Sequence, residues 1–158
     1  GACCRIASWA KLQDKETEKI FMAVNTHFDH VGVEARRNAA LLIIKKIKEI
    51  VGDQPAVLTG DFNVNDQSEA YTTITTNEFV LEDAHKKSPA MAGPHYSWHD
   101  WGMQPMIDRE KIDFIFVTPT ITVNSAFIYQ EHAVDSLKPE TQWGYISDHN
   151  PIVAELEF

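Results

Sequence analysis

The sequence predicts an α/β fold, because short apolar segments with strand character alternate with amphipathic helical segments. The clearest helix is expected over residues 34–51, where apolar residues recur at three- and four-residue spacing: Ala40, Ile43, Ile44, Ile47 and Val51. Gly52 follows and suits the left-handed conformation that closes a helix. Apolar strands are expected before this helix, at 20–24, and after it, at 56–61. Such a strand–helix–strand unit favours parallel pairing with a right-handed crossover.

The remaining elements follow from alternation and local signals. Further strands are expected over residues 5–12, 112–117, 120–129 and 152–158, with a short extended piece at 79–84. The strands at 5–12 and 20–24 form a hairpin in this interpretation, and Ser68 caps a short helix over 68–76. A polar loop is expected at 25–33. A long irregular segment is expected at 86–106, and loops of that length are often functional.

The length of 158 residues indicates one domain or a large piece of one. The net charge of −9 argues against a sequence-independent nucleic-acid binder, which needs a basic surface. It does not exclude an enzyme that acts on phosphate groups, because metal-binding carboxylates also make a site acidic. Cys3 and Cys4 are neighbours, so neither a disulfide framework nor a four-cysteine zinc site is expected. No apolar stretch reaches membrane-spanning length, and the cellular location stays open, export from a bacterium included.

Asp61 and Asn63 stand just past the end of a predicted strand, in the segment Gly60-Asp61-Phe62-Asn63. In α/β sheets this is where ligand chemistry usually occurs. The carboxylate could hold a metal or orient a water, and the amide could donate to an oxyanion. A Gly-Asp turn in which Asn63 caps the next segment explains this stretch equally well by itself.

Asp113 interrupts an apolar strand in which Phe114 and Phe116 face the other way. A lone carboxylate is costly to bury unless it is paired. His149 is a suitable partner, because a carboxylate fixes the tautomer of an imidazole and stabilises its protonated form, and the pair could then deprotonate a water. The adjacent Asp148 would point elsewhere and could bind a divalent cation. Hard oxygen ligands of this kind suit Mg²⁺ or Mn²⁺ better than Zn²⁺.

Four motifs follow one another along the chain: Asn25-Thr26-His27, Gly60-Asp61-Phe62-Asn63, Asp113-Phe114-Ile115-Phe116-Val117 and Ser147-Asp148-His149-Asn150-Pro151. In order and approximate spacing they resemble the endonuclease/exonuclease/phosphatase family, which includes pancreatic-type deoxyribonucleases and bacterial sphingomyelinases. Each motif is weak singly, and the four together are strong. The resemblance implies a four-layered α/β sandwich and hydrolysis of a phosphoester that depends on Mg²⁺ or Mn²⁺. The substrates it implies are phosphorylated small molecules, lipid headgroups or nucleic acids.

The resemblance also implies a role for each matching residue. His149 resembles the general base, paired with Asp113. Asp61 resembles the acid that orients the water and contacts the metal, and Asp148 resembles a further metal-site carboxylate. Asn63 resembles a phosphate-binding amide.

Three further residues are substrate-side candidates. His27 resembles the histidine that contacts the scissile phosphate or assists the leaving group, although a loop histidine bonded to backbone is the stronger interpretation of this residue alone. Arg36 lies in a segment that resembles a bacterial branch of the family, where it either reaches a substrate phosphate or is a solvated arginine at a helix start. Tyr96-Ser97-Trp98-His99 resembles the substrate-side loop of that branch, which makes His99 a candidate contact.

The family fold comprises two similar halves, and this chain resembles the second. The first half normally supplies a metal-binding Glu after a Leu-Gln pair. The segment Lys11-Leu12-Gln13-Asp14 echoes that pair but stands at a hairpin turn, only a few residues before His27. We therefore expect residues 1–158 to form the C-terminal part of a domain whose N-terminal part is absent. We also expect this part alone to bind Mg²⁺ weakly and to be weakly active or inactive.

Two alternatives compete with this interpretation. The segment His27-Phe28-Asp29-His30 echoes zinc hydrolases of the metallo-β-lactamase type, but Asn25 stands where that motif needs a further histidine. The other alternative is a non-catalytic binding module that kept the scaffold and lost the chemistry. The joint presence of Asp61, Asp113 and His149 counts against it.

Overall fold

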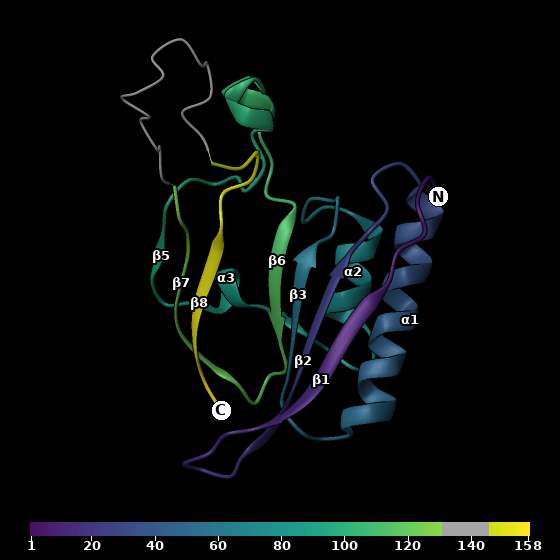
Figure 1. Cartoon of the computed structure of the whole chain (residues 1–158), viewed down its shortest axis with the longest axis vertical. Coiled ribbons are helices and arrows are strands. Elements are labelled where there is room, and N and C mark those ends of the chain that lie inside the picture. The colour runs from purple at the N-terminus through teal and green to yellow at the C-terminus, as the bar shows by residue number, and fades with distance from the viewer. Residues whose placement is uncertain (131–145) are drawn as a thin grey trace.

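The computed structural model describes residues 1–130 and 146–158, which form a mixed α/β structure with two sheets (Figure 1). The larger sheet has the strand order β1-β2-β3-β6-β4, and the smaller has the order β5-β7-β8. The predicted α/β class is confirmed. The elements are β1 (Ala7–Gln13), β2 (Ile20–His27), α1 (Val33–Val51), β3 (Ala56–Asp61), α2 (Glu69–Thr76), β4 (Glu82–Asp83), α3 (Ala84–Lys87), β5 (Met91–Ala92), β6 (Asp113–Val117), β7 (Thr122–Ile128) and β8 (Ile152–Glu157), with short 3₁₀ turns at Asp100–Gly102 and Met106–Asp108.

The strand–helix–strand unit has the predicted topology. Strands β2 and β3 pair in parallel, and α1 connects them. The buried residues of α1 are the five that the spacing predicts, Ala40, Ile43, Ile44, Ile47 and Val51. Gly52 closes the helix at a positive φ of 59°, and the Ser68 side chain caps α2 by accepting the Tyr71 N–H at 3.1 Å.

Two cores lie on opposite faces of the larger sheet. Helices α1 and α2 cover one face (Figure 1), and residues such as Leu58, Phe114 and Phe116 are buried beneath them. On the other face, Val117 belongs to a second core with residues of the smaller sheet, and Ile115 packs against it. The predicted alternation along β6 is confirmed, and Asp113 therefore faces away from the helices. No described helix is both long and apolar enough to cross a membrane.

One expectation about the chain before α1 was wrong. Residues 25–27 were expected in a loop, but β2 continues through them to His27. The reason is the parallel pairing with β3, which extends to the His27–Asp61 pair. Only the stretch from Phe28 onward forms the connection to α1.

Gly60 makes the close approach of β2 and β3 feasible. Its φ is 154°, and a Cβ at this position would overlap the carbonyl oxygen of Thr26 on the neighbouring strand. A side chain would therefore be strained and would also push the two strands apart. Because His27 and Asp61 are the next pair along these strands, Gly60 supports the place where the polar residues gather.

We predict that Gly60→Ala lowers the free energy of unfolding by roughly 3 kcal/mol or more, from strain and backbone overlap together. Gly52→Ala is the matched control, since Gly52 also has a positive φ but no atom lies within 4 Å of the added methyl group. The control should cost about 1 kcal/mol. Urea unfolding of both variants provides the comparison. Equal losses would show that the approach of β2 to β3 does not require glycine.

Candidate active site

Three of the predicted site residues form a row across neighbouring strands. His27 on β2 pairs with Asp61 on β3, and Asp61 pairs with Asp113 on β6. Paired residues on adjacent strands direct their side chains to the same face of a sheet. The row lies at the carboxyl ends of β2 and β3, where ligand sites of α/β sheets usually occur.

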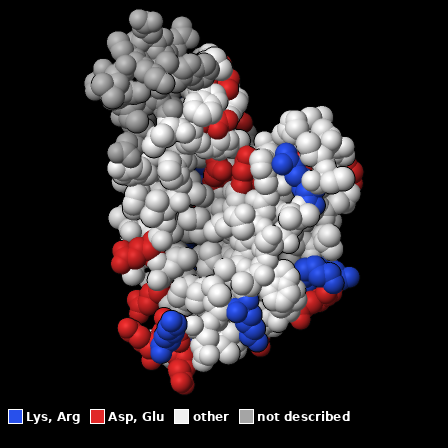
Figure 2. All heavy atoms as spheres, viewed as in Figure 1, with Lys and Arg blue, Asp and Glu red and all other residues white. Residues whose placement is uncertain are grey.

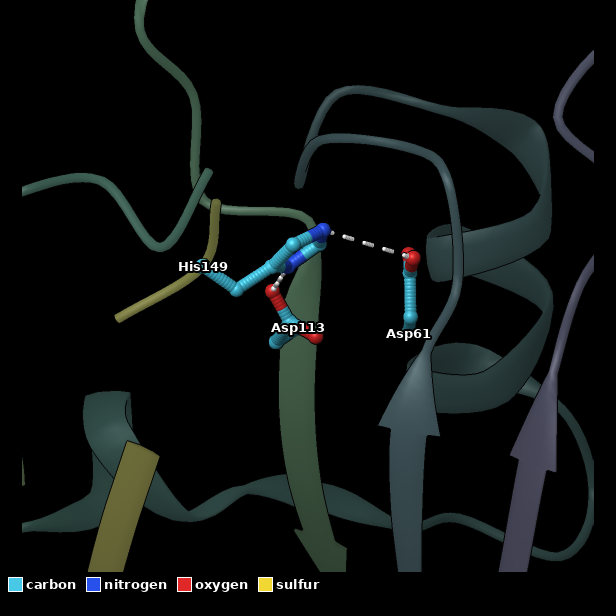
Figure 3. Close-up of side chains that lie close together, drawn as sticks. All are labelled: Asp61, Asp113 and His149. Atoms are coloured by element: carbon cyan, nitrogen blue, oxygen red, sulfur yellow. Dashed lines mark hydrogen bonds and ion pairs between the residues drawn. The ribbon is translucent and has the colours of Figure 1, made fainter. Parts of the chain in front are cut away.

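His149 completes the group from a distant part of the sequence. Its backbone pairs with Trp98, and its Nδ1 lies 2.7 Å from Oδ2 of Asp113. The opposite ring nitrogen, Nε2, lies 4.0 Å from Oδ2 of Asp61. Figure 3 shows the imidazole between the two carboxylates, one on each side. The structure thus brings the predicted pair, Asp113 and His149, into contact.

Asp61 is held by contacts on both of its carboxylate oxygens. Oδ1 accepts the backbone N–H of Asn63 at 2.8 Å, and Oδ2 lies 3.2 Å from Nε2 of His27. Asn63 adopts a positive φ of 50°, and its side-chain amide donates to the Phe28 carbonyl at 3.0 Å. Asn63 therefore positions Asp61 and ties its loop to the end of β2. His27 is largely exposed, with 52% of its side chain accessible, so its ring is open to a ligand.

The environment shifts the proton affinities of two members of this group. Burial raises the pKa of Asp61 and the nearby Asp113 carboxylate adds to the effect, while the Asn63 N–H and the two histidines oppose it. The hydrogen bond that the His149 ring donates to Asp113 raises the pKa of His149 above its ordinary value, and partial burial opposes that rise. Perturbed proton affinities of this kind are common at catalytic sites.

The donor atoms of Asp61, Asp113 and His149 fit a divalent cation. One ligand atom from each lies within 4.8 Å of the others, and all three residues are half-buried. Two carboxylates and one imidazole suit Mn²⁺, and carboxylate oxygens with water suit Mg²⁺. Burial and, to a smaller extent, repulsion from Asp113 raise the pKa of Asp61, and a bound cation would relieve that repulsion.

The zinc-hydrolase alternative rests on the segment 27–30, and Asp29 in this segment has a structural function instead. The carboxylate of Asp29 is buried and accepts the backbone N–H groups of Val31 at 2.9 Å, of Gly32 and of Cys3 at 2.7 Å. These contacts hold the pKa of Asp29 well below its usual range. Asp29 thus shapes the loop before α1, as a turn residue would. Because backbone N–H groups occupy the Asp29 carboxylate, the structure gives no support to a zinc site that includes Asp29.

Three other predicted residues lie around the group rather than in it. The side chain of Asp148 is near the Ser147 hydroxyl, at 3.5 Å, and is not a member of the metal-capable group found among the described residues. Arg36 donates from Nη1 to the Asp29 carbonyl at 2.9 Å. His99 is buried, with Nδ1 accepting the Gly102 N–H at 3.1 Å, and it lines a pocket of about 80 Å³ together with His149. Their metal and substrate roles stay predictions.

One face of the molecule has an acidic hollow. Figure 2 shows acidic atoms in a hollow in the upper half of the face in view, with a broad uncharged surface below them. Lys and Arg side chains lie mainly toward the margins of this face. An acidic hollow attracts cations and repels a bare polyanion.

Comparison with known proteins agrees with this geometry. Residues 3–149 match the model of the endonuclease/exonuclease/phosphatase family. An endonuclease/exonuclease/phosphatase from Bacteroides vulgatus is 59% identical, with a TM-score of 0.89 over 99% of this chain and 56% of that one. The mannosyl-6-phosphatase of Bacteroides thetaiotaomicron is 30% identical, with a TM-score of 0.85 over 98% of this chain and 57% of that one.

The human nocturnin catalytic domain, solved with bound sulfate, is 24% identical over 98% of this chain and 53% of that one, with a TM-score of 0.73, and it shares the fold. The chain therefore belongs to the endonuclease/exonuclease/phosphatase family, as its four motifs predict. It spans about half the length of these solved relatives.

The raised pKa of His149 gives a prediction about stability. A histidine with a raised folded-state pKa contributes stability that is fully present below its unfolded pKa, about 6.5, and is lost as the pH rises through the folded value. Asp113→Asn should therefore lower the free energy of unfolding by roughly 1–2 kcal/mol at pH 6 and by less at pH 8.5.

Urea unfolding in the presence of EDTA measures this difference. Asp53→Asn, at an exposed carboxylate, is the control and should show no such dependence on pH. An equal loss for Asp113→Asn at both pH values would mean that the Asp113–His149 contact does not favour the protonated imidazole.

Proposed function

We propose that this chain carries the water-activating part of a metal-dependent phosphoester hydrolase. The observation that supports it most is the position of His149, with Nδ1 on Asp113 and Nε2 directed toward Asp61. A general base needs one nitrogen held in a fixed tautomer and the other free to accept a proton. The family membership supports phosphoester hydrolysis as the reaction class.

Each residue of the group has a separate task in this proposal. His149 takes the proton of the attacking water, and Asp113 stabilises the imidazolium that forms. Asp61 orients the water beside Nε2 of His149. His27, whose ring is exposed, donates to a phosphate oxygen or to the leaving group. Asn63 holds Asp61 through its backbone N–H and is proposed to bind phosphate.

A divalent cation, Mg²⁺ or Mn²⁺, is the proposed cofactor. Asp61 is its first candidate ligand, and the second carboxylate is either Asp113, which belongs to the same metal-capable group, or Asp148, which the family resemblance implies. When bound, the cation would neutralise charge on the phosphate and lower the barrier to attack by water. We further propose that residues 1–158 are the C-terminal part of the domain, so that a further metal ligand comes from outside this chain.

A phosphorylated sugar is the substrate class that we propose first. A relative that is 30% identical over nearly the whole chain is named as a mannosyl-6-phosphatase. The net charge of −9 and the acidic hollow disfavour a long nucleic acid. Outside the row formed by His27, Asp61 and Asp113, we propose that Arg36 and His99 contact the substrate. Lipid headgroups and other small phosphoesters remain the competing substrates.

We predict that His149→Ala and Asp61→Asn each reduce kcat/KM by roughly 10²–10⁴-fold in a chain that also contains the preceding half of the domain. The assay measures phosphate release from mannose 6-phosphate, and turnover of a chromogenic phosphodiester, with Mg²⁺ and with EDTA. His30→Gln is the control, because this histidine is exposed and its Nδ1 lies 3.4 Å from Nη2 of Arg5, which is not one of the proposed site residues. Full activity in either site variant would contradict the proposed mechanism.

We also predict that residues 1–158 alone turn over these substrates far more slowly than the longer chain. The physical reason is that an incomplete ligand set binds Mg²⁺ weakly. Comparable turnover of the same phosphoester by the two chains would contradict the partial-domain proposal. Substrate binding without turnover in the longer chain would favour the non-catalytic binding module instead.

A further inference from the structure

Ser97 lies between the two chain segments that carry Asp113 and His149. The residue is completely buried, in the irregular segment before β6. Its hydroxyl oxygen accepts two consecutive backbone N–H groups, that of Ile112 at 2.9 Å and that of Asp113 at 3.0 Å. The hydroxyl therefore fixes the backbone from which the Asp113 side chain projects.

The backbone of the same segment is hydrogen-bonded to the residues around His149. The Ser97 carbonyl accepts the N–H of Asn150 at 2.6 Å, and the next residue, Trp98, pairs with His149. The N–H of His99 donates to the Asp148 carbonyl at 3.0 Å. Residues 97–99 are thus bonded to the residues on both sides of His149.

The segment is also hydrogen-bonded to the chain just before β6. The N–H groups of Ser97 and Trp98 both donate to the Glu110 carbonyl, each at 3.1 Å. The segment therefore runs as a strap between residues 110–113 and residues 148–150. Within this segment, Ser97 bonds Asp113 directly and also bonds a neighbour of His149.

We propose that Ser97 is a positioning residue that sets the alignment of Asp113 with His149, an inference that rests on the proposed function for its catalytic meaning. The 2.7 Å contact between the two side chains joins segments 36 residues apart. Such a contact persists only if both backbones are fixed. Ser97 fixes one through its hydroxyl and the other through its carbonyl.

The hydroxyl is the part of Ser97 that can be tested by substitution. Ser97→Ala keeps the carbonyl and the fold of the strap but leaves two buried N–H groups without their acceptor. The start of β6 can then shift, and the bond between Asp113 and the imidazole lengthens. Ser88→Ala is the matched control, because Ser88 is also buried and its hydroxyl exchanges two hydrogen bonds with Ala90, away from the pair.

The direct test is nitrogen-edited NMR of the His149 ring in the 158-residue chain at a fixed pH, without metal. In the unsubstituted chain and in Ser88→Ala, the proton on Nδ1 should give a downfield resonance protected from solvent exchange. In Ser97→Ala that resonance should be lost to exchange. Ser97→Thr, which restores a hydroxyl, should recover it.

A persistent resonance in folded Ser97→Ala would overturn the proposal. If Ser97→Ala does not fold, Ser97→Cys is the second variant, since a thiol of similar size is a weak acceptor. Its resonance should weaken, and an unchanged resonance would again overturn the proposal. In the longer chain, Ser97→Ala should lower kcat about tenfold with KM changed less than about twofold. An inactive longer chain with the NMR effect intact would reject the proposed function and leave the positioning role in place.

Discussion

Two carboxylates that face each other across β3 and β6 impose the constraint on which this site depends. Asp61 and Asp113 are a directly paired couple in an antiparallel ladder, and like charges at such positions destabilise a sheet. Each carboxylate has its own contacts that offset this repulsion. His149 contacts Asp113, and Asp61 is contacted by the Asn63 N–H and by His27. A local arrangement that costs stability and is surrounded by compensating contacts is typical of a functional site.

The same constraint explains why the site combines rigid and open parts. The row from His27 to Asp113 is held by strand pairing, beneath which Leu58 and Phe114 are buried. His149 is held from a separate segment, through its own side chain and through the strap at residues 97–99. His27 gives the group an exposed side, because about half of its side chain is accessible. A cation and a small phosphoester could therefore reach carboxylates that the fold keeps close together.

Much of this could be predicted from the sequence, because some signals are local. The face of α1 follows from helical periodicity, and the partner of Asp113 follows from the cost of burying a lone carboxylate in an apolar strand. Other features depend on tertiary pairing. The extension of β2 to His27 exists only because β3 lies alongside it. The role of Ser97 has no local signal, since a single serine between aromatic residues looks the same in any loop. The burial of His99 likewise depends on segments distant in sequence.

The pH dependence of kcat/KM for Asp113→Asn in the longer chain, assayed with Mg²⁺, tests most directly whether Asp113 makes His149 the base. The acid limb of such a profile reports the proton affinity of the free enzyme's base. We predict that the plateau falls by roughly 10²-fold or more and that the acid limb moves to lower pH, because the pKa of His149 is no longer raised by Asp113. A profile with an unchanged plateau and an unchanged acid limb would contradict the central claim that Asp113 makes His149 the base.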